Sequence, residues 1–413
     1  MSKLDELYTP KQQEVLKRIW SDDWFICGLH GAKRAGKTVV NNDTFIGELV
    51  RVRKIASQLG INEPIYILAG TSSTSIQNNV LQELFNKYGF IPKYDKHGSF
   101  LFLGVKVVQV YTGSIGGLQR ARGFTAFGAY VNEASLANET VFKEIISRCS
   151  GEGARIVWDS NPDIPTHWLR RDYVNSDDAM IIDFHFQLDD NTFLSQRYRD
   201  NIKSATPEGM FYDRDILGLW VTGDGIVYRD FKESMYIDAP QTEIVSYYAG
   251  VDWGYEHFGS IVVLGEDAAG SVYLLEEYAY QHEEIDFWVD IAKDIKERYG
   301  NIVFWADSAR PEHVARFRRE RLKCQNASKA RLSGVEEVAK LMKRGHFFVL
   351  KDKVAKFKDE IYQYVWNTRT GEPEKENDDV MDALRYAIYS HHINQNKENT
   401  SEHDFALLQA GFR

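Results

Sequence analysis

The chain has 413 residues, of which 43% are hydrophobic and 27% are charged, and this composition excludes a disordered or fibrous protein. The formal charge of −10 argues against nonspecific coating of nucleic acid, although a local basic groove remains compatible with it. Three distant cysteines without CxxC spacing argue against a disulfide scaffold or a cysteine zinc site. The cysteine pattern fits a reducing cytoplasm. No apolar run approaches the roughly 20 residues of a membrane span, so we expect no membrane partner.

Short apolar segments alternate with polar helical windows through the first half of the chain, which is typical of βαβ units in a mostly parallel sheet. The aromatic and charged segment 167–221 is expected to be largely helical and to form a small subdomain beside that sheet. The expected strands are Phe25–His30, Ile65–Thr71, Val107–Thr112, Gly128–Asn132 and Arg155–Asp159.

A change in composition near residues 222–245, where glycine and proline interrupt the pattern, predicts a domain boundary. The predicted division is a first domain at 1–235 with a lid or linker subdomain at about 165–235, a linker at 236–244, a second domain at 245–393 and a polar C-terminal tail at 394–413.

Residues 31–38, GAKRAGKT, match the phosphate-binding (Walker A) pattern GxxxxGK[ST] between an expected strand and an expected helix. Gly31 and Gly36 allow backbone N–H groups to wrap a phosphate chain, and the helix N-terminus adds positive potential. Lys37 is expected to contact the β- and γ-phosphates of ATP, and the Thr38 hydroxyl to ligate Mg²⁺. Arg34 either adds charge near the γ-phosphate or is a solvated loop residue.

The strand that ends in Asn132 and Glu133 is expected to complete the ATP site. Glu133 is suited to polarise the attacking water, whereas Asn132 offers no charge to Mg²⁺ but can accept from metal-bound water. Ser160 and Asn161, after the next strand, are expected to sense the phosphate, with a plain turn as the alternative. Near the N-terminus, Gln12 is a weaker candidate for holding adenine.

The second half begins with three expected strands in a meander, followed by alternating helices and strands, which is the order of an RNase H-like domain. The expected strands are 246–252, 260–265, 271–278, 302–306 and 346–350, and the expected helices open near Pro311 or span 335–344 and 380–390.

Aspartates are placed at the ends of these elements. Asp252 and Asp307 end two expected strands, and Asp378, Asp379 and Asp382 open the last helix. Spacings of three and four residues put the last three on one helical face. Carboxylate oxygens suit Mg²⁺ or Mn²⁺, and two such ions roughly 4 Å apart activate water for phosphodiester hydrolysis. Each aspartate alone has a structural explanation. Carboxylates at the first strand, at a later strand and in the last helix nevertheless follow the order of an RNase H-like domain, and this order favours a metal site.

Basic residues are concentrated after the second of these strands. A basic strip beside a carboxylate site would hold a duplex by its phosphates, and an exposed helix face is the alternative. The basic residues are Arg316, Arg318, Arg319, Arg321, Lys323, Lys329, Arg331, Lys340, Lys343 and Arg344.

Together these motifs resemble the large terminase subunit of tailed bacteriophages or prophages, over roughly Tyr8 to Tyr389. The resemblance implies an α/β chain with an N-terminal P-loop ATPase domain of the RecA or ASCE type and a C-terminal RNase H-like nuclease domain. The matching segments are 31–38, 132–133, 160–162, 218–228, 251–255, 306–308 and 378–386.

The resemblance implies a motor that packages DNA. A ring of five subunits docks on the portal protein of a procapsid and pumps double-stranded DNA inward with ATP and Mg²⁺. The nuclease cuts concatemeric DNA at initiation and termination, and a small terminase subunit selects the genome. The isolated subunit is expected to be a monomer, located in the cytoplasm of the infected bacterium and transiently on the portal, not in the mature virion. The alternatives are a cellular helicase-nuclease or repair ATPase, and a non-catalytic procapsid scaffold.

The family also implies roles for single residues. Glu133 would be the hydrolytic carboxylate, and 160–162 would couple hydrolysis to movement. Arg122 or Arg120 is the candidate for an arginine that reaches a neighbour's ATP. Asp379 stands where relatives often carry a histidine, so its role stays open. The ligands of two nuclease Mg²⁺ or Mn²⁺ ions would be Asp252, Asp307 and Asp382.

Overall fold

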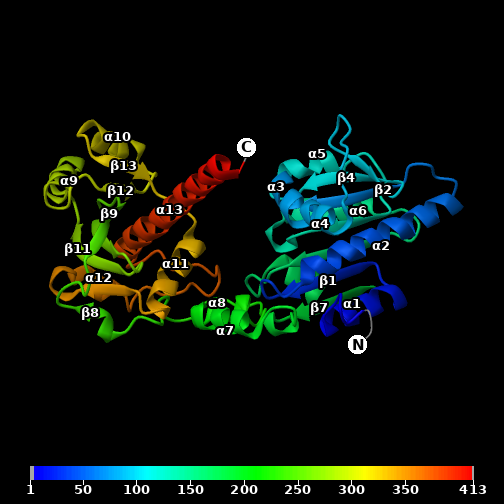
Figure 1. Ribbon diagram of the computed structural model, residues 1–413, viewed down its shortest axis with the longest axis horizontal. Coiled ribbons are helices and arrows are strands. Elements are labelled where there is room, and N and C mark those ends of the chain that lie inside the picture. The colour runs from blue at the N-terminus through cyan, green and yellow to red at the C-terminus, as the bar shows by residue number, and fades with distance from the viewer. Residues whose placement is uncertain (1–3, 412–413) are drawn as a thin grey trace. The chain divides into compact units, whose positions relative to one another are not determined.

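The computed structural model describes residues 4–411, with side chains through residue 395. Its contacts divide the chain into two compact units. The first unit is formed by the residues up to Lys203 together with Tyr212–Val221, and the second by Ser204–Phe211 together with the residues from Thr222 onward. Each unit contains one seven-stranded sheet with helices beside it (Figure 1).

The sheet of the first unit has the strand order β3-β4-β2-β5-β6-β1-β7. All neighbouring strands pair in parallel except β3 and β4. The five strands expected in this half are confirmed to within two residues. Four of them, β1, β2, β5 and β6, are buried along nearly their whole length and are therefore nearly continuous apolar runs. The strands are β1 Ile26–Gly31, β2 Ile65–Gly70, β3 Phe100–Phe102, β4 Val105–Tyr111, β5 Gly128–Val131, β6 Arg155–Ser160 and β7 Ile181–Phe186.

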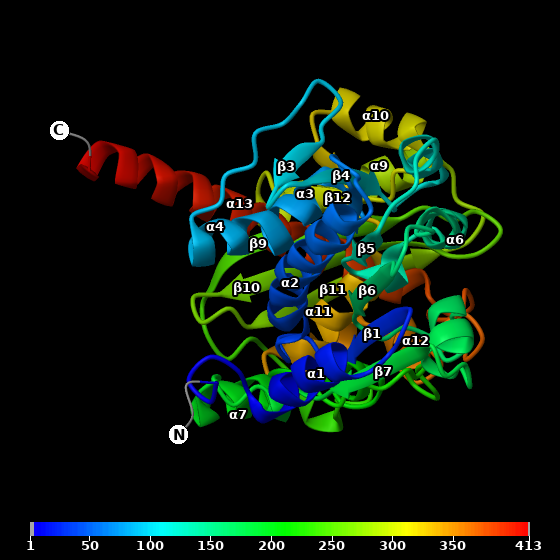
Figure 2. The ribbon, with the colours of Figure 1, turned by 90° about the vertical axis from the view of Figure 1, so that its right-hand side faces the viewer.

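Helices cover both faces of this sheet. Helix α2 packs across β4, β5 and β6, as Figure 2 shows, and buries Phe45, Leu49 and Val52 in one apolar layer. Helix α6 contributes Phe142 and Ile145 to the layer that contains Trp158. The helices are α1 Pro10–Ser21, α2 Lys37–Gln58, α3 Ser73–Ile76, α4 Gln82–Tyr88, α5 Leu118–Ala121, α6 Glu139–Arg148, α7 Gln196–Ala205 and α8 Met210–Asp215.

The prediction that residues 167–221 are largely helical is wrong at the centre of this segment. Ile181–Phe186 forms β7, which pairs in parallel with β1 and completes the sheet. Its burial alternates along the strand, with Ile182, Phe184 and Phe186 in the core. This period of two is the pattern of a half-buried edge strand, and it was present in the sequence.

The sheet of the second unit has the order β13-β12-β9-β10-β11-β14-β8. The expected meander is confirmed: β9, β10 and β11 pair antiparallel, whereas β12 pairs in parallel with β9. The strands are β8 Tyr236–Ile237, β9 Ile244–Asp252, β10 Gly259–Asp267, β11 Val272–Tyr280, β12 Val303–Ala306, β13 Lys323–Asn326 and β14 Phe347–Leu350.

Helix α13 lies along β9, β10 and β12 of this sheet. A side chain at Gly250 would clash with the carbonyl group of Ala383, so the glycine permits the close approach of α13 to β9. The approach occurs two residues before Asp252. The helices of the unit are α9 Ile285–Tyr299, α10 Pro311–Arg319, α11 Arg331–Lys343, α12 Ala355–Glu360 and α13 Asp379–Gly411.

Two predicted boundary segments contain regular structure. Strand β8 lies within 236–244, the predicted linker, and pairs with β14. The backbone of 394–411, in the predicted tail, continues helix α13, while 412–413 lie outside the described residues. The domain boundaries themselves stay predictions. Among the helices of residues 4–411, none combines the length and apolar character needed to cross a membrane.

Candidate nucleotide and metal sites

The loop between β1 and α2 has the backbone conformation of an anion-binding cradle. Gly31, Arg34 and Gly36 have φ values of 137°, 58° and 92°. A side chain at Gly31 would clash with the backbone of Phe186, so the neighbouring edge strand also requires glycine there. Positive φ values turn backbone N–H groups toward a common concavity, and α2 begins at Lys37 directly behind it. The loop therefore has the geometry to bind a phosphate chain.

Lys37 is folded back onto this loop. Its ammonium group donates to the carbonyl oxygens of Gly31 at 2.9 Å and Ala32 at 2.6 Å, and to Oδ1 of Asn161 at 3.1 Å. Burial lowers the pKa of Lys37 to about 8, against the opposing charges of two aspartates. All three acceptors of this buried ammonium group are neutral. Negatively charged phosphate oxygens would form stronger hydrogen bonds with it than these acceptors do.

A cavity of about 650 Å³ lies over the loop, a volume typical of small-molecule sites. The structure brings most of the predicted nucleotide residues to its wall. Those residues are Arg34, Gly36, Lys37, Thr38, Asn132, Glu133, Ser160 and Asn161. Asp159, which closes the expected strand directly before Ser160, lines it as well, as does Asn79, which was not predicted as a site residue.

The ends of β5 and β6 are joined by side-chain hydrogen bonds. Asn132 Nδ2 donates to Oδ1 of Asp159 at 2.8 Å, and Asn132 Oδ1 accepts from Asn79 at 2.9 Å. Glu133 has a φ of 55°, and burial followed by the charge of Asp159 raises the pKa of its carboxyl group. The hydroxyl of Ser160 accepts from the N–H of Ser135 at 2.9 Å. This link ties the residues after Glu133 to the adjacent strand.

Gln12 does not line the cavity. Its Oε1 accepts from the N–H of Thr9 at 2.9 Å in the N-terminal cap of α1, and its Nε2 donates to the carbonyl of Gly36 at 2.9 Å. The amide therefore braces the phosphate loop from behind, because the cap of α1 fixes its direction. The contact of Gln12 with adenine stays a prediction.

The two arginines proposed for a neighbour's ATP lie outside the cavity of their own chain. Arg122 is exposed and lies 3.7 Å from Glu144. Arg120 packs over the ring of Tyr111, 4.7 Å from its centroid. Their role between subunits stays a prediction.

The second candidate site lies where β9, β12 and α13 meet. The parallel pairing of β9 and β12 brings their carboxyl ends together, and the N–H of Asp307 donates to the carbonyl of Val251 at 2.9 Å. Asp252, Asp307, Asp378, Asp379 and Asp382 all line a cavity of about 950 Å³ there. The tertiary structure thus gathers the five aspartates that the sequence singled out.

Burial and mutual repulsion both raise the pKa values of these aspartates. Burial, followed by the charges of Asp382 and Asp307, raises the pKa of Asp252 well above its usual range. Burial and the charge of Asp382 raise the pKa of Asp378 to about 6. Buried carboxylates that repel one another favour a bound cation, because the cation offsets their negative charges.

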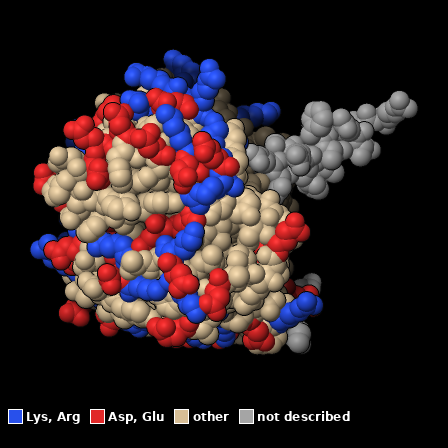
Figure 3. All heavy atoms as spheres, turned by 90° about the vertical axis from the view of Figure 1, so that its left-hand side faces the viewer, with Lys and Arg blue, Asp and Glu red and all other residues tan. Residues whose placement is uncertain are grey.

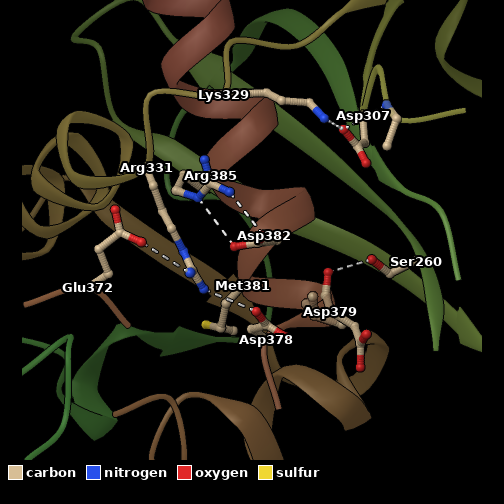
Figure 4. Close-up of polar contacts among 12 residues, drawn as sticks. Ser260, Asp307, Lys329, Arg331, Glu372, Asp378, Asp379, Met381, Asp382 and Arg385 are labelled. Atoms are coloured by element: carbon tan, nitrogen blue, oxygen red, sulfur yellow. Dashed lines mark hydrogen bonds and ion pairs between the residues drawn. The ribbon is translucent and has the colours of Figure 1, made fainter. Parts of the chain in front are cut away.

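Basic side chains lie within ion-pair distance of four of the five aspartates, whereas Asp252 has no such partner among residues 4–395. Figure 4 shows three of the pairs around the start of α13. The four pairs are Lys329 with Asp307 at 2.7 Å, Arg331 with Asp378 at 3.3 Å, Arg385 with Asp382 at 2.9 Å and His257 with Asp379 at 3.4 Å.

In the side chains described here, no three His, Cys, Asp or Glu residues approach closely enough to hold one metal ion. The donor set nevertheless fits Mg²⁺ or Mn²⁺, since it consists of adjacent carboxylates. The basic partners contact carboxylate oxygens that metal ligation would use, so a metal ion would compete with them.

The sequence did not indicate what holds the start of α13. Glu360 Oε2 accepts from the N–H groups of Val380 at 2.8 Å and Met381 at 3.2 Å. The hydroxyl of Ser260 donates to the carbonyl of Asp379 at 2.7 Å (Figure 4). Both partners come from distant parts of the chain, so no local capping pattern could have identified them.

The predicted basic strip is only partly realised. Lys329 and Arg331 line the carboxylate cavity, but Arg316 pairs with Asp286 at 2.9 Å and with Glu320 at 2.9 Å. Figure 3 shows acidic and basic side chains interspersed on one face of the second unit. The basic residues nearest the aspartates are therefore the better candidates for contacts with phosphates.

No protein-family model and no curated protein matches the chain. Among solved structures, the large terminase of the thermophilic bacteriophage D6E is similar, with 24% identity, a TM-score of 0.78 and coverage of 94% of this chain and 99% of that chain. The chain has the fold of a large terminase.

The same phage protein in complex with ADP is 25% identical, with a TM-score of 0.74 and coverage of 92% and 98%. Its complex with ATP-γ-S is 24% identical, with a TM-score of 0.73 and the same coverage. Because the likeness extends over both units, the resemblance to large terminases predicted from the motifs is confirmed at the level of the fold.

Proposed function

We propose that the chain is a phage DNA-packaging motor subunit, in which ATP hydrolysis drives double-stranded DNA into a procapsid and a metal-dependent endonuclease cuts it. One observation carries the proposal: a phosphate loop with a buried lysine and a cavity lined by five aspartates occur in one chain with the large-terminase fold. A repair ATPase or a scaffold would not require both.

In the ATPase half, Lys37 would bind the β- and γ-phosphates, and Thr38 would hold Mg²⁺, which shields phosphate charge when bound. Glu133 would orient and deprotonate the attacking water. Its raised pKa makes it a stronger base than an exposed glutamate. The ADP and ATP-γ-S complexes of the D6E protein support a nucleotide as the ligand of this cavity.

In the nuclease half, an antiparallel meander followed by the parallel strand β12 supports an RNase H-like domain. Asp252, Asp307 and Asp382 would hold one or two Mg²⁺ or Mn²⁺ ions, which supply Lewis-acid activation of water when bound. Lys329 and Arg331 would be released from their aspartates and bind the phosphates of the DNA.

The wider assembly is also part of the proposal. The subunit would act as a ring of five on the portal protein, with Arg122 or Arg120 reaching a neighbour's ATP and a small terminase subunit selecting the DNA. Its place would be the host cytoplasm and, transiently, the portal. Stimulation of ATP hydrolysis by procapsids would favour packaging over repair.

Two substitutions separate the two activities. Lys37→Ala should abolish ATP hydrolysis and leave plasmid cleavage intact, whereas Asp252→Ala should abolish cleavage in Mg²⁺ or Mn²⁺ and leave ATP hydrolysis intact. EDTA should stop cleavage by the unmodified protein. Asp290→Ala, at an exposed position of α9, is the matched control. Folded protein that cuts with neither metal and hydrolyses no ATP would favour a scaffold.

A further inference from the structure

Asp159, on β6, is a buried carboxylate in the wall of the nucleotide cavity. It is 2% exposed and forms no ion pair among the side chains that the structure describes. Its Oδ2 accepts from the hydroxyl of Tyr130 at 2.7 Å. Its Oδ1 accepts from Asn132 Nδ2 at 2.8 Å and from the N–H of Glu133 at 3.2 Å. Three neutral donors therefore hold one buried negative charge.

Burying an ionised carboxylate is costly unless a cation or metal compensates it. This cost matters here because the neighbouring strand ends in the neutral Asn132, which offers no charge to Mg²⁺. Strands β5 and β6 pair in parallel with Val131 opposite Trp158, so the next residues, Asn132 and Asp159, lie side by side. The negative charge that is missing from β5 is present one strand away.

We propose that Asp159 is a positioning residue that supplies this charge to the Mg²⁺–nucleotide site through Asn132. By accepting from Asn132 Nδ2, Asp159 turns the amide oxygen of Asn132 away from itself. The charge-assisted hydrogen bond polarises the amide and makes that oxygen a stronger acceptor for metal-bound water. The second contact, from the N–H of Glu133, holds the backbone that aims the hydrolytic carboxylate.

The inference rests on the proposed binding of nucleotide. Nucleotide binding measured without metal distinguishes a failure of the inference about Asp159 from a failure of the proposed function. A fluorescent ADP analogue is titrated in EDTA and then at increasing Mg²⁺, with thermal unfolding as a check on folding. The wild-type protein should bind in EDTA through Lys37 and more tightly with Mg²⁺. If the wild-type protein does not bind, or Lys37→Ala binds equally well, the proposed function fails.

Asp159→Asn should bind the analogue in EDTA with a Kd within about twofold of that of wild type. It should require about 10-fold more Mg²⁺ to reach half of the Mg²⁺-dependent increase in affinity, as expected for the loss of one charge-assisted hydrogen bond. The swap Asn132→Asp with Asp159→Asn returns one carboxylate to the pair and should restore the Mg²⁺ midpoint to within about threefold. Asp163→Asn, in the segment directly after β6 and half-exposed beside Arg214, should leave both titrations unchanged.

A merely structural Asp159 would weaken binding equally in EDTA and in Mg²⁺, and that result overturns the inference, as does a swap that restores nothing. If Asp159→Asn fails to fold, Asn132→Asp alone remains decisive. It places a second carboxylate beside Asp159, so Mg²⁺ should raise its unfolding temperature more than that of wild type. An equal or smaller rise would contradict the proposed charge.

Discussion

Asp378→Asn should stabilise the metal-free protein at pH 8. Asp378 lines the aspartate cavity with its side chain 20% exposed and 3.3 Å from Arg331. Burial first, and then the charge of Asp382, raise its pKa from 3.8 to about 6. The folded state therefore binds a proton more readily than the unfolded state between these values. Stability should fall as the pH rises from about 4 to about 6 and remain reduced above that window.

The size of the effect follows from the pKa. A rise from 3.8 to about 6 corresponds to a cost of about 3 kcal/mol at pH 8. The variant removes this cost. The shift already includes the favourable charge of Arg331, so the ion pair is not subtracted again. After a discount for the partial exposure of the site, the net gain is about 2 kcal/mol, or roughly 4–8 °C in the unfolding temperature of a unit of this size.

Calorimetry at pH 5 and pH 8 in EDTA measures the gain. Glu372→Gln is the matched control, because Glu372 also faces Arg331, at 3.7 Å, but is half-exposed; its effect should stay within about 0.5 kcal/mol. Added Mn²⁺ should stabilise the wild-type protein more than Asp378→Asn. An unfolding temperature at or below that of wild type at pH 8, or an equal gain at pH 5, would refute the assigned repulsion.

Three further predictions test packing around the sites, and the substitutions in each are measured by urea unfolding. Gly218→Ala, at a φ of 71° and with its methyl 2.6 Å from a backbone nitrogen of the phosphate loop, should cost more than about 2 kcal/mol and weaken nucleotide binding. Gly270→Ala, at a φ of 78° with open space around it, is the control and should cost only about 1 kcal/mol. Equal costs for Gly218→Ala and Gly270→Ala would contradict the steric clash at Gly218. Glu360→Ala should cost about 1–3 kcal/mol by uncapping α13 and weaken Mn²⁺ binding, whereas Glu360→Gln keeps an acceptor and should cost less. Gln12→Ala should cost about 1 kcal/mol and lower nucleotide affinity, and an unchanged affinity would show that the brace behind Gly36 is dispensable.

Local patterns in the sequence determined the phosphate loop and most of the strands. Residues 31–38 specify their conformation through glycine positions and the adjoining strand and helix, all within one short segment. The central strands β1, β2, β5 and β6 are buried along nearly their whole length, so they are recognisable without knowledge of their neighbours. The resemblance to large terminases depended on the order of such segments, and order is a property of the sequence.

Tertiary structure alone decided how the sites are completed. Asn132 and Asp159 become partners only because β5 and β6 pair, and Glu360 caps α13 from 20 residues away. Lys329 reaches Asp307 only because β12 and β13 run side by side. Such contacts depend on which elements meet, and burial then sets the charge of each group. The spacing of residues along the chain predicts neither which elements meet nor how deeply a charged group is buried.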